Sequence, residues 1–471
     1  MKVDMSYRAV LERKAEIIRK SAGIDFSRFE SGGLAFDYEA MLKSTGYDLA
    51  RVGEIQREVS VGGTPIIELR NVTALARAFS PPGKGARIFI KDEAANPSGS
   101  FKDRRAAIAA FHAKKVGYKG LIAATSGNFG AAVASQAAIR GLKCIIVQEC
   151  YDSRMVGQPE IIEKARKCEA FGAEVVQTSV GPELFYQSLR LLEETGYFSA
   201  SLYSPFGIVG METLGFELAG QMKALTGRFP DAVVCTNAGG GNVTGTARGL
   251  AKAGCAAKVI GASVNLAGLH MASDTAFNRK SFTTGHTGFG IPFATWPDRS
   301  DVPRSGARPL RYMDRYVTVA QGEVFYMTEL LASLEGLERG PAGNTSLAAA
   351  FAIAREMDRD QTLVVQETEY TGAGKHIRSQ LSFAMDNGIR LEAGNPRKEV
   401  PGRDIILPET PGLAGMDEVD LNALRKSLVG NAVRGRPGTI SDADIAFLAE
   451  ETRLDAESVG RIVNEIKGEQ K

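Results

Sequence analysis

Short apolar runs rich in β-branched residues alternate with stretches of helical spacing from about residue 61 to residue 380. The apolar runs predict strands over 87–91, 121–124, 144–148, 174–177, 232–235, 258–262 and 362–366. The stretches between them predict helices over 103–116, 131–140, 158–171, 184–194, 213–225 and 345–357. Strands that alternate with helices in this way indicate an α/β fold with largely parallel sheets.

The two ends of the chain and one internal segment break this alternation. Residues 1–60 predict helices, turns and polar connections, and the Gly-, Pro-, Thr- and Arg-rich segment of about 270–310 predicts a long loop. Beyond a polar connection that begins near Pro401, the tail predicts two helices, at about 418–428 and 441–467. Ser441 has the chemistry of a residue that caps the second of these helices.

Composition narrows the class of protein without identifying it. The 471 residues are 44% hydrophobic and 24% charged, and 57 basic and 55 acidic residues give a net charge of +2. These values are typical of a globular protein and give no electrostatic argument for nucleic acid or a membrane as partner. The five cysteines form no CxxC pair and the four histidines no HxxxH pair. Disulfides and a metal site are therefore not expected.

The N-terminus carries no apolar signal core. No uncharged run approaches the roughly 20 residues that cross a bilayer. We therefore expect a soluble, cytoplasmic protein.

Candidate chemistry is densest in Asn96–Arg104, between a predicted strand and a predicted helix. Its Asn-Pro and Ser-Gly pairs predict a tight loop, with Ser98 or Ser100 as the helix cap. Lys102 would then lie in or near the first helical turn, where the positive end of the helix disfavours a cation. A lowered pKa would supply the neutral amine that forms a Schiff base. An ordinary solvated lysine also explains this segment when it is taken alone.

Three further turns follow predicted strands. The small residues of Thr125–Gly130 let backbone N–H groups approach an anion such as a carboxylate. Asn237–Asn242 exposes backbone donors suited to a phosphate, but its spacing matches neither GxGxxG nor a P-loop. Glu369–His376 places hydroxyl groups at another strand end, where open α/β sheets bind ligands. Each turn alone is equally typical of an ordinary connection between strand and helix.

In their order and spacing, the four segments resemble the fold-type II pyridoxal 5′-phosphate (PLP) enzymes, the tryptophan synthase β-subunit superfamily, over about residues 60–380. The resemblance implies an α/β fold of two three-layer αβα domains with mainly parallel sheets, and PLP as cofactor. With it we expect an N-terminal segment 1–60, a large PLP-binding domain 61–119 and 215–395, a smaller domain 120–214 and a C-terminal helical extension 396–471.

The resemblance also implies roles for individual residues. Lys102 would form the Schiff base with the cofactor and act as the general base. The residues that would face the substrate carboxylate are Ser126, Gly127, Asn128 and Phe129, with Asn128 also near the cofactor's 3′-oxygen. The remaining cofactor contacts would be Gly239, Gly240, Gly241 and Asn242 at the phosphate and Thr371 at the pyridine nitrogen. The turn Gly340–Ser346 resembles the superfamily's helix-opening turn near the active site.

Within the superfamily, the motifs are most similar to the threonine synthase and threonine dehydratase branch, with two departures. Arg105 stands where threonine synthases usually have glycine, and residues 395–471 form an extension that simpler dehydratases lack. In length, and in the stretches 6–38 and 148–154, the chain is more similar to the PLP-bearing β-subunits of 2-amino-4-oxopentanoate thiolases.

The thiolase resemblance implies a reaction and partners. The reaction would be cleavage of 2-amino-4-oxopentanoate by coenzyme A to acetyl-CoA and alanine, in ornithine degradation. The chain would be the catalytic subunit beside a small α subunit, as a homodimer of β-subunits within a hetero-oligomer. Because none of the five cysteines lies in a motif loop, no acyl-cysteine intermediate is expected.

Several alternatives stay open. A threonine synthase or threonine dehydratase-like lyase would act on a hydroxy- or phospho-amino acid. The absence of GxGxxG counts against a nucleotide-dependent oxidoreductase, and the near-zero net charge counts against a nucleic-acid binder that uses Arg434–Gly438. The cluster Arg299, Arg304, Arg308 and Arg311 would either contact coenzyme A phosphates or, as the favoured interpretation, form a solvated loop or subunit contact.

Overall fold

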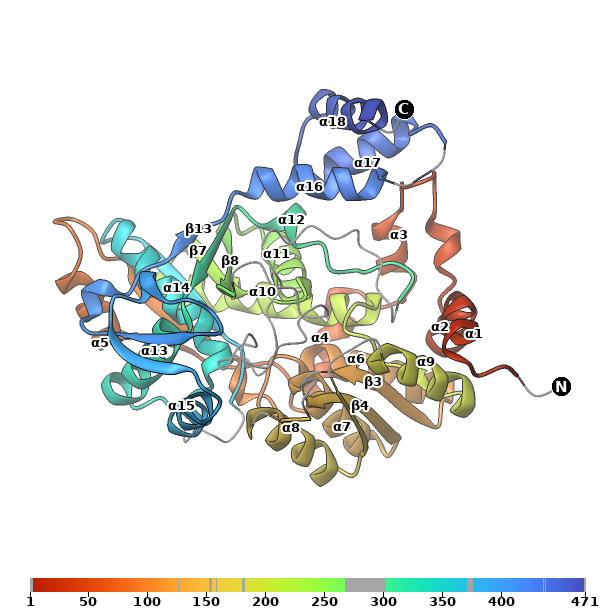
Figure 1. The fold of residues 1–471 in the computed structure, drawn as a ribbon, viewed down its shortest axis with the longest axis horizontal. Coiled ribbons are helices and arrows are strands. Elements are labelled where there is room, and N and C mark those ends of the chain that lie inside the picture. Colours follow the sequence, from red (N-terminus) through yellow and green to blue (C-terminus); the bar gives the residue numbers. More distant parts are fainter. Residues whose placement is uncertain are drawn as a thin grey trace.

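Two sheets of mainly parallel strands, with helices packed on both faces of the larger one, form the body of the molecule (Figure 1). The computed structural model describes residues 3–125, 127–151, 155–157, 159–179, 183–266, 302–370, 376–434, 436 and 438–469. The α/β fold with largely parallel sheets that the sequence predicts is therefore confirmed.

The larger sheet has seven strands, which lie side by side in the order β1-β2-β10-β7-β8-β9-β13. Their bounds are Ile66–Glu68 (β1), Arg87–Asp92 (β2), Thr362–Glu367 (β10), Ala232–Thr236 (β7), Lys258–Val264 (β8), Arg315–Val319 (β9) and Asp417–Glu418 (β13). The five central strands are parallel, and the edge strands β1 and β13 pair antiparallel. Strand β10 is buried along its whole length, as expected for a parallel strand covered on both faces.

Alternate residues of the central strands enter two separate apolar layers, one on each face of the larger sheet. Ile88 and Ile90 pack in one layer, and Phe89 between them packs in the other. This is the period of two that a strand imposes on its side chains. The helices of the first layer are α5 (Arg70–Ala78), α13 (Gln321–Glu335) and α14 (Pro341–Glu356), and those of the second are α10 (Pro205–Thr226) and α11 (Gly241–Lys252).

The smaller sheet has four parallel strands in the order β5-β4-β3-β6. Their bounds are Glu174–Ser179 (β5), Lys143–Tyr151 (β4), Gly120–Thr125 (β3) and Phe198–Ser199 (β6). The helices that pack on it are α7 (Asn128–Arg140), α8 (Pro159–Ala170) and α9 (Glu183–Thr195). All four strands fall inside the range 120–214 that the sequence assigns to a smaller domain.

Two helices carry the chain between the sheets. The chain leaves β2 of the larger sheet and enters β3 of the smaller one through α6 (Asp103–Val116). It returns from β6 to β7 through α10, and these two crossover helices pack against each other. The start of α6, which follows Lys102, therefore lies where the two sheets meet.

Helices α1 and α2 pack against α9 beside the smaller sheet, and one apolar cluster runs from that sheet through the N-terminal helices into the C-terminal helices. The N-terminal helices are α1 (Tyr7–Glu12), α2 (Lys14–Ala22), α3 (Tyr38–Lys43) and α4 (Leu49–Arg57). The C-terminal helices α16 (Leu421–Val433), α17 (Asp442–Thr452) and α18 (Ala456–Glu469) gather at one end of the molecule (Figure 1). The buried Asp444 carboxylate joins the two ends because it accepts hydrogen bonds from the Leu34 and Ala35 backbone N–H groups at 2.7 and 2.9 Å.

The remaining described elements stand outside the two sheets. They are α12 (Pro309–Tyr312), α15 (His376–Asp386), β11 (Arg390–Gly394), β12 (Asp404–Pro408) and the 3₁₀ turns Phe26–Phe29, Glu93–Ala95, Pro396–Lys398 and Pro411–Leu413. Strands β11 and β12 form a separate parallel pair. Within the described ranges, no helix is both long and apolar enough to cross a bilayer.

The structure corrects several predicted elements. The single helix expected over 441–467 is two helices, α17 and α18, because Arg453 turns into the left-handed region at φ 53°. Ser441 does cap the first of them, its hydroxyl accepting from the Asp444 N–H. The tail also contributes strands β12 and β13, where the sequence predicted a polar connection. Most of the long loop expected over about 270–310 lies outside the described residues.

Candidate active site

Four strands from the two sheets end at one cavity. The adjacent strands β2, β10 and β7 lead into the loops that carry Lys102, Thr368 and Gly239–Asn242, and β3 of the smaller sheet leads into Gly127–Phe129. The cavity encloses about 130 Å³. Its lining residues include Phe101, Lys102, Arg105, Thr125, Gly127, Asn128, Phe129, Lys164, Tyr203, Gly239, Gly240, Gly241, Asn242, Ala342 and Glu369. Loops after neighbouring parallel strands meet at one sheet edge, which is why segments far apart in sequence line one cavity.

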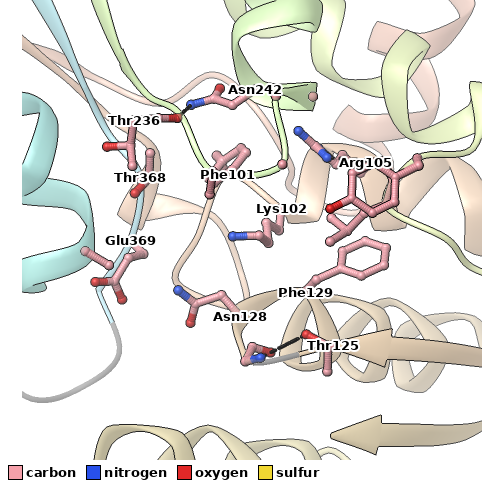
Figure 2. Close-up of a pocket in the computed structure, with 18 of the residues that line it drawn as sticks. Phe101, Lys102, Arg105, Thr125, Asn128, Phe129, Thr236, Asn242, Thr368 and Glu369 are labelled. Atoms are coloured by element: carbon pink, nitrogen blue, oxygen red, sulfur yellow. Dashed lines mark hydrogen bonds between the residues drawn. The ribbon is translucent and has the colours of Figure 1, made fainter. Parts of the chain in front are cut away.

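The amine of Lys102 projects into the middle of this cavity (Figure 2). Lys102 is the residue immediately before α6, and its Nζ lies 4.6 Å from the centre of the Phe101 ring. Among the described residues, it has no hydrogen-bond or ion-pair partner. Burial, and then the charges of Arg105 and Lys164, lower the pKa of Lys102 to about 7, against an opposing effect of Glu369. The lowered pKa expected from the sequence thus arises mainly from burial, whereas the sequence argument relied on the helix end.

Backbone hydrogen bonds fasten the Lys102 loop to the end of β10. The Phe101 N–H donates to the Thr368 carbonyl oxygen at 3.0 Å, and the Tyr370 N–H donates to the Gly99 carbonyl oxygen at 2.7 Å. Gly99 has φ 77°, and a Cβ there would lie 2.4 Å from the Tyr370 carbonyl oxygen. Only glycine meets both conditions without strain, so this position fixes the path of the chain into Lys102.

The serines of the same loop do not cap the helix, so this prediction is wrong. No side chain caps the start of α6. Instead, a side chain of the helix accepts a hydrogen bond from the loop, since the Ser98 backbone N–H donates to Asp103 Oδ2 at 2.7 Å. Gln136 Nε2 donates to the other oxygen, Asp103 Oδ1, at 3.2 Å. Because Gln136 belongs to α7, Asp103 ties the Lys102 loop to the helix of the smaller sheet.

The glycine loop predicted to bind phosphate closes one side of the cavity. Gly240, at φ 80°, precedes α11, and a Cβ on it would lie 2.5 Å from the Pro309 ring. A Cβ on Gly239 would lie 2.5 Å from the Tyr203 hydroxyl, and one on Gly241 would lie 2.8 Å from Arg105 Nη1. Side chains therefore have no room here, and the backbone at the start of α11 faces the cavity directly.

The loop predicted to face a carboxylate lies across the cavity, at the start of α7. Thr125 Oγ1 accepts from the Gly127 N–H at 2.9 Å and from the Gly130 N–H at 3.3 Å, which shapes the turn. The Asn128 side chain lines the cavity beside Lys102 (Figure 2). The helix predicted over 131–140 begins at Asn128, so this loop is part of a helix N-terminus. Ser126 and Thr371 lie outside the described residues.

The cavity wall also contains Arg105, Lys164 and Tyr203, which were not predicted as site residues. Arg105 was noted only as a departure from a family pattern. Lys164 comes from α8 with no motif around it, and Tyr203 precedes α10. Lys164 forms a buried ion pair with Glu160 one helical turn away, and its Cδ would lie 2.5 Å from a Cβ on Gly127. The one sequence signal was the second arginine of the Lys-Asp-Arg-Arg string.

Two buried carboxylates lie at the end of β10, close to the start of α14. Glu369 points toward Gly340 and Glu367 points toward Gly343, and a Cβ on either glycine would lie within 2 Å of a carboxylate oxygen. Burial, and then the charges of Glu369 and Asp92, raise the pKa of Glu367 well above its usual range. The resemblance placed the turn Gly340–Ser346 near the active site, and its Ala342 lines the cavity.

The described members of the arginine cluster, Arg304, Arg308 and Arg311, do not line the cavity. Arg308 and Arg311 form ion pairs with Glu451 and Glu450 of α17. Arg308 also lies over the Tyr38 ring, 4.0 Å from its centre. Arg304 and Arg308 are buried, so for these residues the prediction of a solvated loop is wrong. Arg299 lies outside the described residues.

Comparisons with known proteins agree with this geometry. A family model described as "Pyridoxal-phosphate dependent enzyme" matches residues 58–369. A 2-amino-4-ketopentanoate thiolase beta subunit from Acetoanaerobium sticklandii is 69% identical over 99% of this chain and 100% of its own length. A second protein of that name, from an unknown prokaryotic organism, is 62% identical over 99% of both chains.

A solved structure, a threonine deaminase from T.th., has the same fold over the part of the chain that carries the cavity. Its TM-score is 0.52 at 26% identity, over 69% of this chain and 98% of that one. The family model covers well over half of the chain and includes Lys102, the glycine loop and the end of β10. The chain belongs to the family of pyridoxal-phosphate dependent enzymes.

Proposed function

We propose that this chain is the catalytic subunit of a thiolase that cleaves 2-amino-4-oxopentanoate with coenzyme A to acetyl-CoA and alanine, a step of ornithine degradation. The observation that carries the proposal is 69% identity to a thiolase beta subunit over 99% of this chain. That likeness extends beyond residue 369, where the family match ends, and so includes the tail. The wider family supports the cofactor, and the full-length likeness supports the substrate.

The cavity has the features that PLP requires. The partly buried Lys102 amine has a pKa of about 7, so a large neutral fraction is available for the cofactor's aldehyde. The glycines before α11 leave no room for a Cβ, so backbone N–H groups are open to a phosphate. Lys102 would hold the aldehyde end of the cofactor, Gly239–Asn242 the phosphate end, and Thr371 the pyridine nitrogen. When bound, PLP supplies a ring that withdraws electrons from the amino-bearing carbon of the substrate.

The residues around Lys102 support substrate binding and proton transfer. The backbone N–H groups of Asn128 and Phe129 at the start of α7 would bind the substrate carboxylate, as Ser126 would beside them, whereas the Gly127 N–H already donates to Thr125. Lys102 accepts the proton from the amino-bearing carbon, since a pKa of about 7 leaves a large neutral fraction of its amine near neutral pH. Overall, the C3–C4 bond of the substrate breaks and a bond forms between sulfur and C4. C3 takes up a proton and becomes the methyl group of alanine.

The cysteines argue against an acyl-cysteine intermediate. All five are buried, and none lines the described part of the cavity. Burial raises the pKa of both Cys168 and Cys235 to about 12, so both thiols are poor nucleophiles at neutral pH. In this proposal the thiolate of coenzyme A therefore attacks the C4 ketone directly.

A second subunit is part of the proposal. Both full-length relatives are named beta subunits, which supports a small α subunit as partner. We propose that two copies of this chain form a dimer within that hetero-oligomer. Co-expression with the α subunit, followed by purification through a tag on either chain, tests the association.

The decisive assay gives the purified complex 2-amino-4-oxopentanoate with coenzyme A, O-phosphohomoserine, or threonine, in parallel. We expect acetyl-CoA and alanine in equal amounts from the first mixture alone. Lys102→Ala removes this activity, whereas Lys115→Ala, at an exposed position of the same helix, retains it. No acetyl-CoA from the assembled complex, or faster turnover of either other substrate, would refute the thiolase proposal.

A further inference from the structure

Arg105 is a buried cation in the cavity wall, and the described part of the chain gives it no counter-charge. Its side chain is only 4% exposed, and its Nη1 donates to the Leu202 carbonyl oxygen at 3.2 Å. Its Nε has no hydrogen-bond partner, and no carboxylate of the described residues lies within ion-pair distance. An unpaired buried charge is costly, so some group outside the described protein atoms is needed to compensate it.

The neighbouring arginine shows how this chain treats a buried structural cation. Arg104 is also fully buried, but Glu93 and Glu217 accept hydrogen bonds from its guanidinium at 2.7–3.2 Å. The side chains of Arg104 and Arg105 lie in different surroundings, although the two residues are adjacent in sequence. The buried charge of Arg104 is thus neutralised by carboxylates, whereas the described residues provide no carboxylate for Arg105.

The guanidinium of Arg105 lies against the glycine loop. Both of its terminal nitrogens would lie within 3 Å of a Cβ on Gly241, the first residue of the twelve-residue helix α11. The guanidinium and the N-terminal end of α11 therefore present positive charge to the same side of the cavity. Glu369, the nearest buried carboxylate that lines the cavity, lies on the other side of Lys102 (Figure 2).

We propose that Arg105 binds the phosphate group of the cofactor and completes the anion site formed by Gly239–Asn242. A guanidinium donates two parallel hydrogen bonds to phosphate oxygens, and that of Arg105 is charged at neutral pH. The phosphate in turn neutralises the arginine. Cofactor binding therefore relieves an electrostatic cost that the cofactor-free protein carries.

The test compares the dissociation constants of two cofactors that differ only in the phosphate. Cofactor-free wild type and Arg105→Gln are titrated with PLP and with pyridoxal, and binding is followed by the absorbance of the bound cofactor. Loss of a hydrogen bond to a charged group predicts about ten- to hundredfold weaker PLP binding in the variant. Pyridoxal binding changes by less than about twofold, because pyridoxal has no phosphate group for Arg105 to bind.

Two further variants and one further measurement control the test. Arg140→Gln is the first control. Arg140 lies at the C-terminal end of α7, is partly buried, and also has an Nε without a hydrogen-bond partner among the described residues. This change should leave both dissociation constants unchanged. Arg105→Lys keeps the charge and retains part of the preference for PLP. The melting temperature of the cofactor-free protein stays equal or rises in Arg105→Gln, since an uncompensated charge is removed.

The proposal is overturned if Arg105→Gln binds PLP as tightly as wild type. It is also overturned if the variant weakens PLP and pyridoxal by the same factor, which would make Arg105 a structural residue. The proposal is likewise overturned if the cofactor-free variant melts well below wild type while the ratio of the two dissociation constants is unchanged, because Arg105 would then be a structural residue.

Discussion

The guanidinium of Arg104 and the carboxylate of Glu93 form a two-pronged ion pair that is closed off from solvent. Nε lies 2.7 Å from Oε2 and Nη2 lies 2.8 Å from Oε1, and neither side chain is exposed. Glu93 follows β2 and Arg104 lies in the first turn of α6. The pair therefore spans the loop that contains Lys102 and holds its two ends together.

Breaking this pair should cost far more stability than breaking a similar pair at the surface. Glu93→Gln leaves the buried Arg104 charge with Glu217 as its remaining described carboxylate partner, and we expect a loss of up to about 3–5 kcal/mol in the free energy of unfolding. Glu68→Gln is the matched control, because Glu68 also lies 2.7 Å from an arginine, Arg87, but both side chains are partly exposed. That change should cost less than about 1 kcal/mol. Urea unfolding of both variants measures the difference, and equal losses would contradict the role of burial.

The same pair makes stability depend on pH in a defined window. Burial alone would raise the pKa of Glu93, but the charge and hydrogen bonds of Arg104 outweigh it and lower the pKa to about 2 from 4.5. A carboxylate whose pKa is lower in the folded state stabilises the protein above pH 4.5, and this contribution disappears as the pH falls toward 2.

Because Glu93→Gln cannot titrate, the gap in unfolding free energy between wild type and this variant should shrink below about pH 4.5. Urea titrations at several pH values give that gap directly. A gap that stays constant across this window would show that Glu93 is not held ionised by Arg104.

The reactivity of Lys102 should follow an unusually low pKa. In the cofactor-free protein, reductive methylation of Lys102 should rise with a midpoint near pH 7, since only the neutral amine reacts. Lys164→Gln removes a neighbouring positive charge and leaves Glu160 unpaired, so the midpoint should move upward. Mass spectrometry of the Lys102 peptide, with the exposed Lys43 as an internal reference, provides the measurement. A midpoint that moves downward, or does not move, would contradict the charge argument.

The contact between α10 and α11 depends on glycine. A Cβ on Gly249 of α11 would lie 2.0 Å from the Glu212 carbonyl oxygen of α10, which is backbone and cannot rotate away. We expect Gly249→Ala to lower the free energy of unfolding by about 1–3 kcal/mol or more through overpacking. Gly220→Ala, on α10 with open space around it, should stabilise by about 0.5–1 kcal/mol. Thermal unfolding of the two variants should therefore shift in opposite directions.

Prediction from the sequence succeeded for most strands of the larger sheet and failed at the start of α10. Four of the five central strands were located to within one or two residues, because parallel strands covered on both faces are continuous apolar runs, but β9 was not predicted. Helix α10 was predicted to start at residue 213 but begins at Pro205. Gly207 and Gly210 weaken the helical pattern in that stretch, yet the contact between α6 and α10 requires Gly210, whose Cβ would lie 2.4 Å from the Arg104 carbonyl oxygen.

The site was predictable where its residues stand in motifs after strands. Lys102, Asn128 and the Gly239–Asn242 loop all line the one cavity. Lys164 was not predictable, because it reaches the cavity from the middle of α8 and only the packing of the smaller sheet brings it there. The role of Arg105 depends on the absence of a partner, which a sequence does not reveal.

The pairing of β2 with β10 has a consequence for how the chain acquires its fold. These neighbours in the centre of the larger sheet pair Arg87 with Thr362, so their contact closes a loop that contains the whole smaller sheet. Such non-local pairing carries a large loop-closure entropy and is slow to form. During synthesis, β2 leaves the ribosome long before its partner, whereas the smaller sheet can assemble from one contiguous stretch. The cavity around Lys102, at the end of β10, is therefore among the last parts of the molecule to take shape.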